Sequence, residues 1–310
     1  MHRINHYRFA NYLKIWSLFS VAYLAFSYFL VGFKSDQLVL IFLIGLLLFI
    51  SKQTRKILIV TVPFIIFWIL FDYMKAFPNY NYDEVSIKSL YEMERNLFGF
   101  NFNGKIVTPN EYFLINHNKI SDLLSGVFYL SWVPVPIFLT LYFLFKKDKE
   151  AIYLPVTFLL ANLIGFVIYY VYPAAPPWYV AKYGFEFIKS TSGSPAGLIR
   201  FDDALGIQLF QSMYQKSSNV FAAMPSLHSA YPVVSLYFAF KKRYLIFSFV
   251  IACTCFGIWF FAVYTSHHYV LDVIAGIFCA LTGIVLFETF NKKIKWFKKI
   301  NDGANKILIQ

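Results

Sequence analysis

The stretch YLIFSFVIACTCFGIWFFAVYTSHHYVLDVIAGIFCALTGIVLFETF, residues 244–290, decides the fold of this chain. It consists of two apolar runs, 244–263 and 269–290, and each has the roughly 20 residues that a helix needs to cross a bilayer. His268 lies between the runs, and Asp272 stands inside the second, where a charged residue is costly and usually functional. The stretch therefore predicts two membrane helices that carry a polar site where they meet.

The composition of the whole chain agrees with a membrane protein. Of the 310 residues, 59% are hydrophobic and 14% are charged, and the mean hydropathy is +0.57. Soluble domains are usually about 45–50% apolar and about 25% charged, so this apolar surplus cannot fit inside one globular core. A soluble protein is therefore excluded.

Apolar runs of similar length recur along the chain. The predicted spans are 12–33, 37–50, 57–77, 120–145, 151–171, 224–240, 244–263 and 269–290. Lys and Arg collect in the cytoplasmic loops of membrane proteins, so the basic residues test this assignment. With the N-terminus inside, every basic cluster falls on one side of the membrane. These clusters lie at 1–11, 52–56, 146–149, 241–243 and 292–299. We therefore predict an all-α polytopic helix bundle with about eight transmembrane helices and both termini in the cytoplasm.

The loops on the two sides differ in charge and length. The net charge of +12 comes mainly from the basic clusters, which orient a membrane protein and attract anionic lipids, so we expect no nucleic-acid partner. The outer loops 78–119 and 172–223 are long, as lids and binding elements usually are. The first contains an amphipathic piece, Ser86–Phe98, that we expect to lie along the membrane surface.

The candidate catalytic residues open two of the predicted spans on the outer side. His228 opens the span 224–240, and His268 opens the span 269–290. His268 and Asp272 are four residues apart and share one face of a helix, so the carboxylate can fix the tautomer of the ring. The other ring nitrogen is then free to act as a nucleophile or a base.

Two other interpretations of these residues remain open. A histidine at a membrane interface is often a structural, hydrogen-bonded residue. Two His and one Asp are also ligands that a metal ion uses. We favour catalysis without a metal or a cofactor, because the three residues supply a nucleophile, an orienting carboxylate and a proton donor, and no zinc-site spacing accompanies them.

The motifs around these residues resemble a known superfamily. Pro225-Ser226-x-His228 and His268-x-x-x-Asp272 are similar to the second and third signatures of the type 2 phosphatidic acid phosphatase superfamily, whose members work through a phosphohistidine without metal. YPAAPPWY (172–179), GSPAGLIRFD (193–202) and MPSLHS (224–229) narrow the resemblance to its inositol phosphorylceramide synthase branch.

This resemblance implies a division of the chain and a reaction. Residues 57–290 would form the six-helix catalytic core, preceded by two N-terminal helices in 1–56 and followed by a basic cytoplasmic tail, 291–310. The expected enzyme moves a phosphoinositol headgroup from phosphatidylinositol to ceramide or dihydroceramide. His268 would attack the phosphorus, and His228 would protonate the departing diacylglycerol.

The chain also departs from the general phosphatase pattern. The Lys/Arg-rich first motif is absent before Pro173, and Ala262 stands where the pattern has an Arg six residues before the catalytic His. Arg200 and Lys182 are candidates to replace these phosphate-binding cations. A phosphodiester carries one negative charge where a monoester carries nearly two, so the loss favours a headgroup transferase.

Four further residues are substrate-binding candidates. Ser226 belongs to the second motif. His267 directly precedes His268 of the third motif, and we interpret it as a positioning or packing residue. We interpret Trp178 and Tyr179 as interfacial anchors, with a sugar-stacking platform as the alternative.

Three alternative functions remain. A lipid phosphate phosphatase would share the first step and let water finish it. A sphingolipid synthase with another headgroup would use the same residues, and a transporter or scaffold would not need the histidines. The composition favours a bacterial inner membrane with a periplasmic site, which would be lumenal in a Golgi protein.

Overall fold

The long apolar runs fold into helices, because only a helix satisfies the backbone hydrogen bonds of a single segment that faces lipid. The structure is a computed structural model that describes residues 6–189, 191–215 and 219–309. Its helices are α1 (His6–Val31), α2 (Ser35–Phe49), α3 (Lys52–Tyr73), α4 (Lys88–Phe98), α5 (Pro109–Ile115), α6 (Lys119–Leu130), α7 (Pro134–Phe145), α8 (Glu150–Val171), α9 (Pro177–Tyr183), α10 (Ile199–Leu205), α11 (Leu209–Gln215), α12 (Leu227–Lys241), α13 (Leu245–Tyr264), α14 (Val270–Lys293) and α15 (Lys295–Ile309). Short 3₁₀ turns lie at Met74–Ala76, Asn79–Asn81 and Ala196–Leu198, and one antiparallel hairpin joins β1 (Phe100–Phe102) to β2 (Lys105–Val107).

The predicted fold class, a helical membrane protein, is confirmed. In the described part of the chain, five helices are long and apolar enough to cross a membrane, namely α1 from Phe9 onwards, α3 with the turn that follows it, α8, α13 and α14. The predicted span 120–145 is a bent pair, α6 and α7, that meet at 46° and count together as a sixth. The other two predicted spans correspond to α2 and α12, which have 15 residues each and are about 22 Å long. The count of eight spans stays a prediction.

The bend between α6 and α7 lies at residues 131–133, directly before Pro134. The expected span 120–145 is broken here, because the sequence places Pro134 and Pro136 in the middle of an otherwise apolar run. Pro134 occupies the first turn of α7, where the amide hydrogen that proline lacks is not needed. A new helix therefore starts at this point.

The core is built around α8, which packs against α3, α7, α12 and α14. Close approach is possible because glycines face bulky neighbours or backbone. A Cβ on Gly165 would lie 2.5 Å from Leu227, and one on Gly283 would lie 3.0 Å from the backbone of Ala161. A buried polar contact also joins two of these helices, since the hydroxyl of Tyr231 donates to Asn162 Oδ1 at 2.6 Å.

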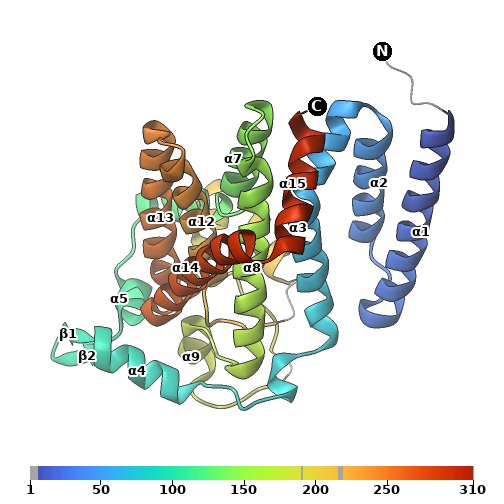
Figure 1. Ribbon diagram of the computed structural model, residues 1–310. Coiled ribbons are helices and arrows are strands. Elements are labelled where there is room, and N and C mark those ends of the chain that lie inside the picture. Colours follow the sequence, from blue (N-terminus) through green and yellow to red (C-terminus); the bar gives the residue numbers. More distant parts are fainter. Residues whose placement is uncertain (1–5, 190, 216–218, 310) are drawn as a thin grey trace.

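The two outer loops fold together into a layer at one end of the bundle. In Figure 1, α4, the hairpin and α9 lie at the end opposite the start of α1 and the end of α15. The loops are joined by backbone hydrogen bonds from Ser86 N to Pro173 O (2.8 Å) and from Ala175 N to Ser86 O (3.1 Å). The amphipathic piece predicted at Ser86–Phe98 is helical as α4, which lies across the end of the bundle (Figure 1).

The predicted tail is mostly the helix α15, which packs back onto the bundle. It contacts α3, α8 and α14, and Leu308 near its end is buried. The ammonium group of Lys56, at the start of α3, donates to the carbonyl of Leu308 at 2.7 Å.

Candidate active site

The structure brings the two predicted histidines together from different helices. His228 lies in the first turn of α12, and His268 lies two residues before α14. His228 Nδ1 and His268 Nε2 are 3.5 Å apart. Residues 40 positions apart therefore present ring nitrogens to one small space.

Asp272 lies behind His268, on the side away from His228. Its Oδ2 is 3.5 Å from His268 Nδ1, an ion-pair distance that is longer than a good hydrogen bond. The same oxygen accepts the backbone N–H of Tyr269 at 2.8 Å, and the residue is fully buried. The carboxylate thus faces Nδ1 and leaves Nε2 directed at His228, as an orienting group should.

The ring of His268 is neutral near pH 7. The residue lies in the connection between α13 and α14 and is buried, and this burial lowers its pKa to about 4. Burial also lowers the pKa of the neighbouring His267. An unprotonated nitrogen is what nucleophilic attack requires.

Ser226 connects the start of α12 to α14, the two helices at whose starts the histidines lie. Its backbone N–H donates to the carbonyl of Asp272 at 2.9 Å, and its buried hydroxyl accepts from Ser229 at 3.0 Å. A Cβ on Gly276 would lie only 2.0 Å from the carbonyl oxygen of Ser226, so α12 and α14 touch backbone to backbone. The position of Ser226 therefore fits a structural contact, and its predicted role in substrate binding stays a prediction.

The second outer loop holds the connection between α13 and α14. We name this connection, together with the last residues of α13 and the first of α14 (263–271), the catalytic turn. The backbone N–H of Trp178 donates to Ser266 O at 3.0 Å, and that of Gly197 donates to Thr265 O at 2.8 Å. Ser266 has a positive φ of 58°, so the turn is sharp. The YPAAPPWY and GSPAGL motifs thus hold the turn in place through backbone hydrogen bonds.

Trp178 and Tyr179 lie under the outer layer and not at an open surface. Both are buried, and they pack with Ile87 and Phe221. The hydroxyl of Tyr179 donates to Glu186 O at 2.7 Å and accepts the N–H of Ile188 at 2.8 Å. Neither the expected interfacial anchors nor a stacking platform fits this burial, because the outer loops fold over both rings.

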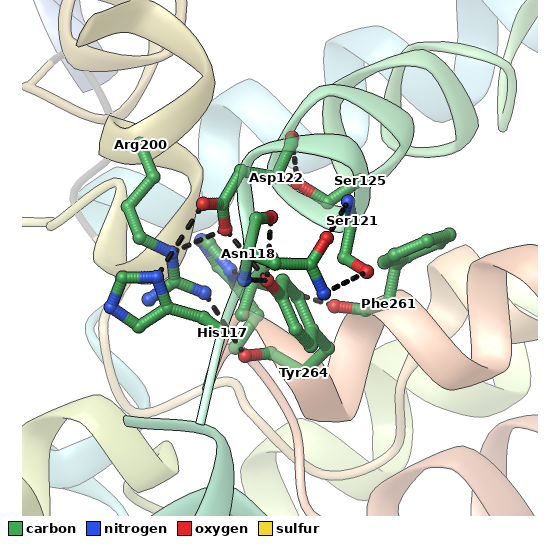
Figure 2. Close-up of polar contacts among 10 residues, drawn as sticks. His117, Asn118, Ser121, Asp122, Ser125, Arg200, Phe261 and Tyr264 are labelled. Carbon is green, nitrogen blue, oxygen red and sulfur yellow. Dashed lines mark hydrogen bonds and ion pairs between the residues drawn. The ribbon is translucent and has the colours of Figure 1, made fainter. Parts of the chain in front are cut away.

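The two candidate phosphate-binding cations have different surroundings. Lys182 is exposed on α9, with its ammonium 5.0 Å from the centre of the Tyr183 ring. Arg200 is mostly buried beside the catalytic turn, where its Nε lies 2.6 Å from Asp122 Oδ1 and its Nη2 donates to Tyr264 O at 3.4 Å. Figure 2 shows this cluster, in which Asp122 offsets the charge of Arg200.

Tyr264 completes this arrangement. Its hydroxyl donates to Asp122 Oδ1 at 2.7 Å, and its ring centre lies 5.0 Å from the guanidinium of Arg200. His117 Nδ1 is 3.5 Å from the other carboxylate oxygen of Asp122. Figure 2 shows that Arg200, Tyr264 and His117 converge on Asp122 from separate segments of the chain.

His267 faces an aromatic wall. Its Nδ1 is 3.0 Å from the hydroxyl of Thr265, and its ring lies 5.1 Å from Tyr129 and 4.8 Å from Tyr214 between centroids. This packing agrees with the interpretation of His267 as a positioning or packing residue.

Sequence reasoning missed the aromatic residues beside His228. The hydroxyl of Tyr129 is 3.4 Å from His228 Nδ1 and accepts from the hydroxyl of Tyr214 at 2.9 Å. The Trp132 ring lies 4.7 Å from the His228 ring, edge to face. In a chain that is 21% aromatic, a Tyr or Trp in an apolar run gives no signal that separates a site wall from a lipid-facing surface.

Among the residues that the structure describes, no group of three or more His, Cys, Asp or Glu could hold a metal ion. The arrangement that is present consists of two imidazoles, one carboxylate and nearby hydroxyl donors.

Comparison with known proteins places this geometry in context. The family model described as the PAP2 superfamily matches residues 88–286. The phosphoinositol dihydroceramide synthase of Bacteroides thetaiotaomicron is 45% identical over 278 residues, which cover 88% of this chain and 90% of that protein.

Two fungal proteins are more distant. The inositol phosphorylceramide synthase catalytic subunit AUR1 of Saccharomyces cerevisiae is 30% identical over 78% of this chain and 58% of its own length. The inositol phosphorylceramide synthase of Candida albicans is 30% identical over 71% of this chain and 44% of its own length. The chain thus matches about half the length of these fungal relatives. No solved structure matches.

Proposed function

The chain belongs to the PAP2 superfamily, and from this premise we propose that it transfers a phosphoinositol headgroup from phosphatidylinositol to ceramide or dihydroceramide. The bacterial relative, which is similar over nearly its whole length, carries the name of such a synthase. Because the chain has several long apolar helices, the enzyme is an integral membrane protein that meets both lipids in the bilayer.

The observation that carries the proposal is the 3.5 Å approach of His228 Nδ1 to His268 Nε2, with Asp272 on the far side of His268. A nucleophile and a proton donor are thereby directed at one point. The catalytic roles of the three residues are part of this proposal.

In the first half-reaction, His268 Nε2 attacks the phosphorus of phosphatidylinositol. A phosphorus–nitrogen bond forms, and the bond from phosphorus to the diacylglycerol oxygen breaks. The leaving oxygen takes a proton from His228, so diacylglycerol departs as a neutral alcohol. Asp272 stabilises the positive charge that develops on the His268 ring.

In the second half-reaction, the primary hydroxyl of the ceramide attacks the phosphohistidine. His228, which has lost its proton, takes the hydroxyl proton, and the phosphorus–nitrogen bond breaks. Inositol phosphorylceramide leaves, and both histidines return to their starting protonation. The proton lost in the first half-reaction is thus recovered in the second.

The environment of Arg200 agrees with a phosphodiester substrate. Its ion pair with Asp122 leaves less than one full positive charge to act on the site. A phosphodiester carries a single negative charge, whereas phosphatidic acid carries nearly two. We include Arg200 as a residue that stabilises the phosphoryl oxygens. Lys182 is a weaker candidate for this role, because it is exposed on α9.

The test is a defined reaction with purified protein. Given labelled phosphatidylinositol and ceramide in EDTA-containing buffer, the wild type should make inositol phosphorylceramide and diacylglycerol in equal amounts, and phosphatidic acid should be a poor substrate. His268→Ala is the control without nucleophile. Rapid phosphate release from phosphatidic acid with no ceramide-dependent product would make the protein a lipid phosphatase. Loss of activity in EDTA, restored by one divalent ion, would support a metal site.

We also propose an orientation and a division of the chain. The basic clusters would face the cytoplasm, and the catalytic turn and outer layer the opposite side, which is periplasmic in a bacterium. Residues 57–290 would be the catalytic core. Single cysteines at Ser194 and Lys147, in a background without native cysteines, should react with an impermeant reagent from opposite sides. Labelling of both on intact cells would contradict the orientation.

A further inference from the structure

Two buried polar residues of the first outer loop, Glu94 and Asn110, reach the catalytic turn. Glu94 lies on α4 and is 0% exposed, and Asn110 lies on α5 and is 2% exposed. Neither belongs to a motif that points to the site. A carboxylate without contact to water needs hydrogen bonds that repay its lost hydration, so its partners show what it does.

The partners of Glu94 are the first amides of α14. Its Oε1 accepts the N–H of Val270 at 3.0 Å, and its Oε2 accepts the N–H of Leu271 at 3.1 Å. The first N–H groups of a helix have no partner inside the helix and attract a negative charge. The third such amide, that of Tyr269, is taken by Asp272. Glu94 thus accepts two of the three amides at the start of α14, and Asp272 accepts the third.

This division fixes the position of Asp272. A carboxylate near the start of a helix competes for free N–H groups. With Val270 and Leu271 occupied by Glu94, Asp272 is left with Tyr269, and its Oδ2 stays 3.5 Å from His268 Nδ1. Without Glu94, the two vacated amides would draw Asp272 along the helix end and away from His268.

Asn110 closes the same turn from its other side. Its Nδ2 donates to the carbonyl of Val263 and to the carbonyl of His268, each at 2.9 Å. One side-chain amide therefore ties the end of α13 to the residue that carries the nucleophilic ring. The backbone of His268 is held by Asn110, and the amides just after it are held by Glu94.

We propose that Glu94 is a positioning residue of the phosphoryl-transfer reaction, which keeps Asp272 directed at His268 by occupying the first amides of α14, with Asn110 as its partner on the opposite side of the turn. This inference rests on the proposed function. It gives the first outer loop a catalytic task.

The protonation of Glu94 supplies a readout that a merely structural residue would not give. Burial raises its pKa to about 7, the two amides oppose this rise, and the nearby Asp272 adds to it. The other titratable groups around it are Tyr269 and Tyr172, together with Tyr91 and its partner Glu111. Only the ionised carboxylate can accept from both amides with full charge, so turnover should rise as the pH passes through about 7.

The test compares Glu94→Gln with Glu92→Gln. Gln has nearly the shape of Glu but can accept only one of the two amides, and Glu92 is an exposed residue on the same helix, 3.7 Å from Lys88. We expect Glu94→Gln to lower kcat about ten- to hundredfold at pH 8, since it loses a charge-assisted hydrogen bond, with little change in KM. The rise near pH 7 should disappear. Glu92→Gln should match the wild type in both respects.

An unchanged kcat and pH profile in Glu94→Gln would overturn the inference, as would an equal loss in Glu92→Gln. If Glu94→Gln does not fold, Glu94→Asp replaces it; its shorter carboxylate should lower kcat and keep the pH-dependent rise, and wild-type turnover would again overturn the inference.

Hydrogen exchange separates this inference from the proposed function, because it needs no substrate. The amides of Val270 and Leu271 should exchange faster in Glu94→Gln than in the wild type. If they do while the wild type makes no inositol phosphorylceramide, only the proposed function fails, and kcat is then compared on phosphatidic acid. If the wild type makes the product and Glu94→Gln is unimpaired, only the inference fails.

Discussion

The helices α1 and α8 are both long and apolar, but they are built into the molecule in different ways. In the apolar segment of α1 only 11% of the residues are buried, against 61% in α8. Phe29 on α1 is 83% exposed, whereas Phe158 on α8 is fully buried. Apolar composition therefore places both helices in the membrane, but only α8 is packed against the helices that carry the site, α12 and α14.

The contacts of α8 and its neighbours hold the core together. Gly165 and Gly283 permit close packing, and Asn162 bonds to Tyr231 across two helices. Between α1 and α2, the ring N–H of Trp16 donates to Ile41 O at 3.2 Å. The following experiments test whether activity depends on the packed core and not on α1.

The largest effect is expected at the two histidines of the core. His268→Ala and His228→Ala should each lower turnover by at least about a thousandfold, because a nucleophile or its proton donor is lost, and the double variant should be little worse than either single one. Product formation by purified protein measures this, with melting in detergent as the folding control. Wild-type turnover in His268→Ala would end the phosphohistidine mechanism.

Asp272→Asn should come next. The amide keeps the size of the carboxylate but cannot stabilise charge on His268, so we expect a loss of about a hundred- to ten-thousandfold in kcat. The measurement is kcat at saturating lipid, with the protein's melting temperature compared in parallel. Full activity would show that this aspartate serves only to cap α14.

Gly276→Ala tests the close packing of the core. The added Cβ would lie 2.0 Å from Ser226 O, so the two helices that carry the histidines must separate. We expect a destabilisation of about 1–3 kcal/mol and a reduced turnover, seen by thermal unfolding and by product formation. Unchanged stability would mean that the backbone contact between α12 and α14 is looser than the structure shows.

The smallest effect is expected on the peripheral side. Phe29→Ala removes a ring that is 83% exposed on α1, so stability should change by less than about 0.5 kcal/mol and turnover should not change. The same assays measure both quantities. A clear loss of turnover would show that α1 contributes to the site and would break the comparison.

The sequence was sufficient to predict the fold class and to single out three residues that the structure brings together. Apolar runs separated by basic clusters carry their information locally, and His228, His268 and Asp272 stand out because polar residues at the mouths of apolar helices are rare. The structure brings these three together as the motif spacing suggested.

The remaining parts of the site could not be read from the sequence. Glu94 lies in an amphipathic helix rich in charge, where a carboxylate is expected to face water, and only its contact with a helix 176 residues further along the chain shows otherwise. Trp178 and Tyr179 look like interfacial residues until the outer loops cover them. The sequence singles out Arg200 as a candidate cation, but it does not show the ion pair with Asp122, because the two residues are 78 positions apart.

The links from Glu94 and Asn110 to the catalytic turn have a consequence for biosynthesis. Both residues are synthesised about 150 to 180 positions before the groups that they bind. Chains are made from the N-terminus, so the first outer loop is synthesised long before α13 and α14 are inserted. A nascent chain that ends before α14 contains Glu94 and Asn110 but lacks the helix start that Glu94 holds. The machinery therefore comes together only as the last helix of the core enters the bilayer, and a truncated product would carry no partly active centre.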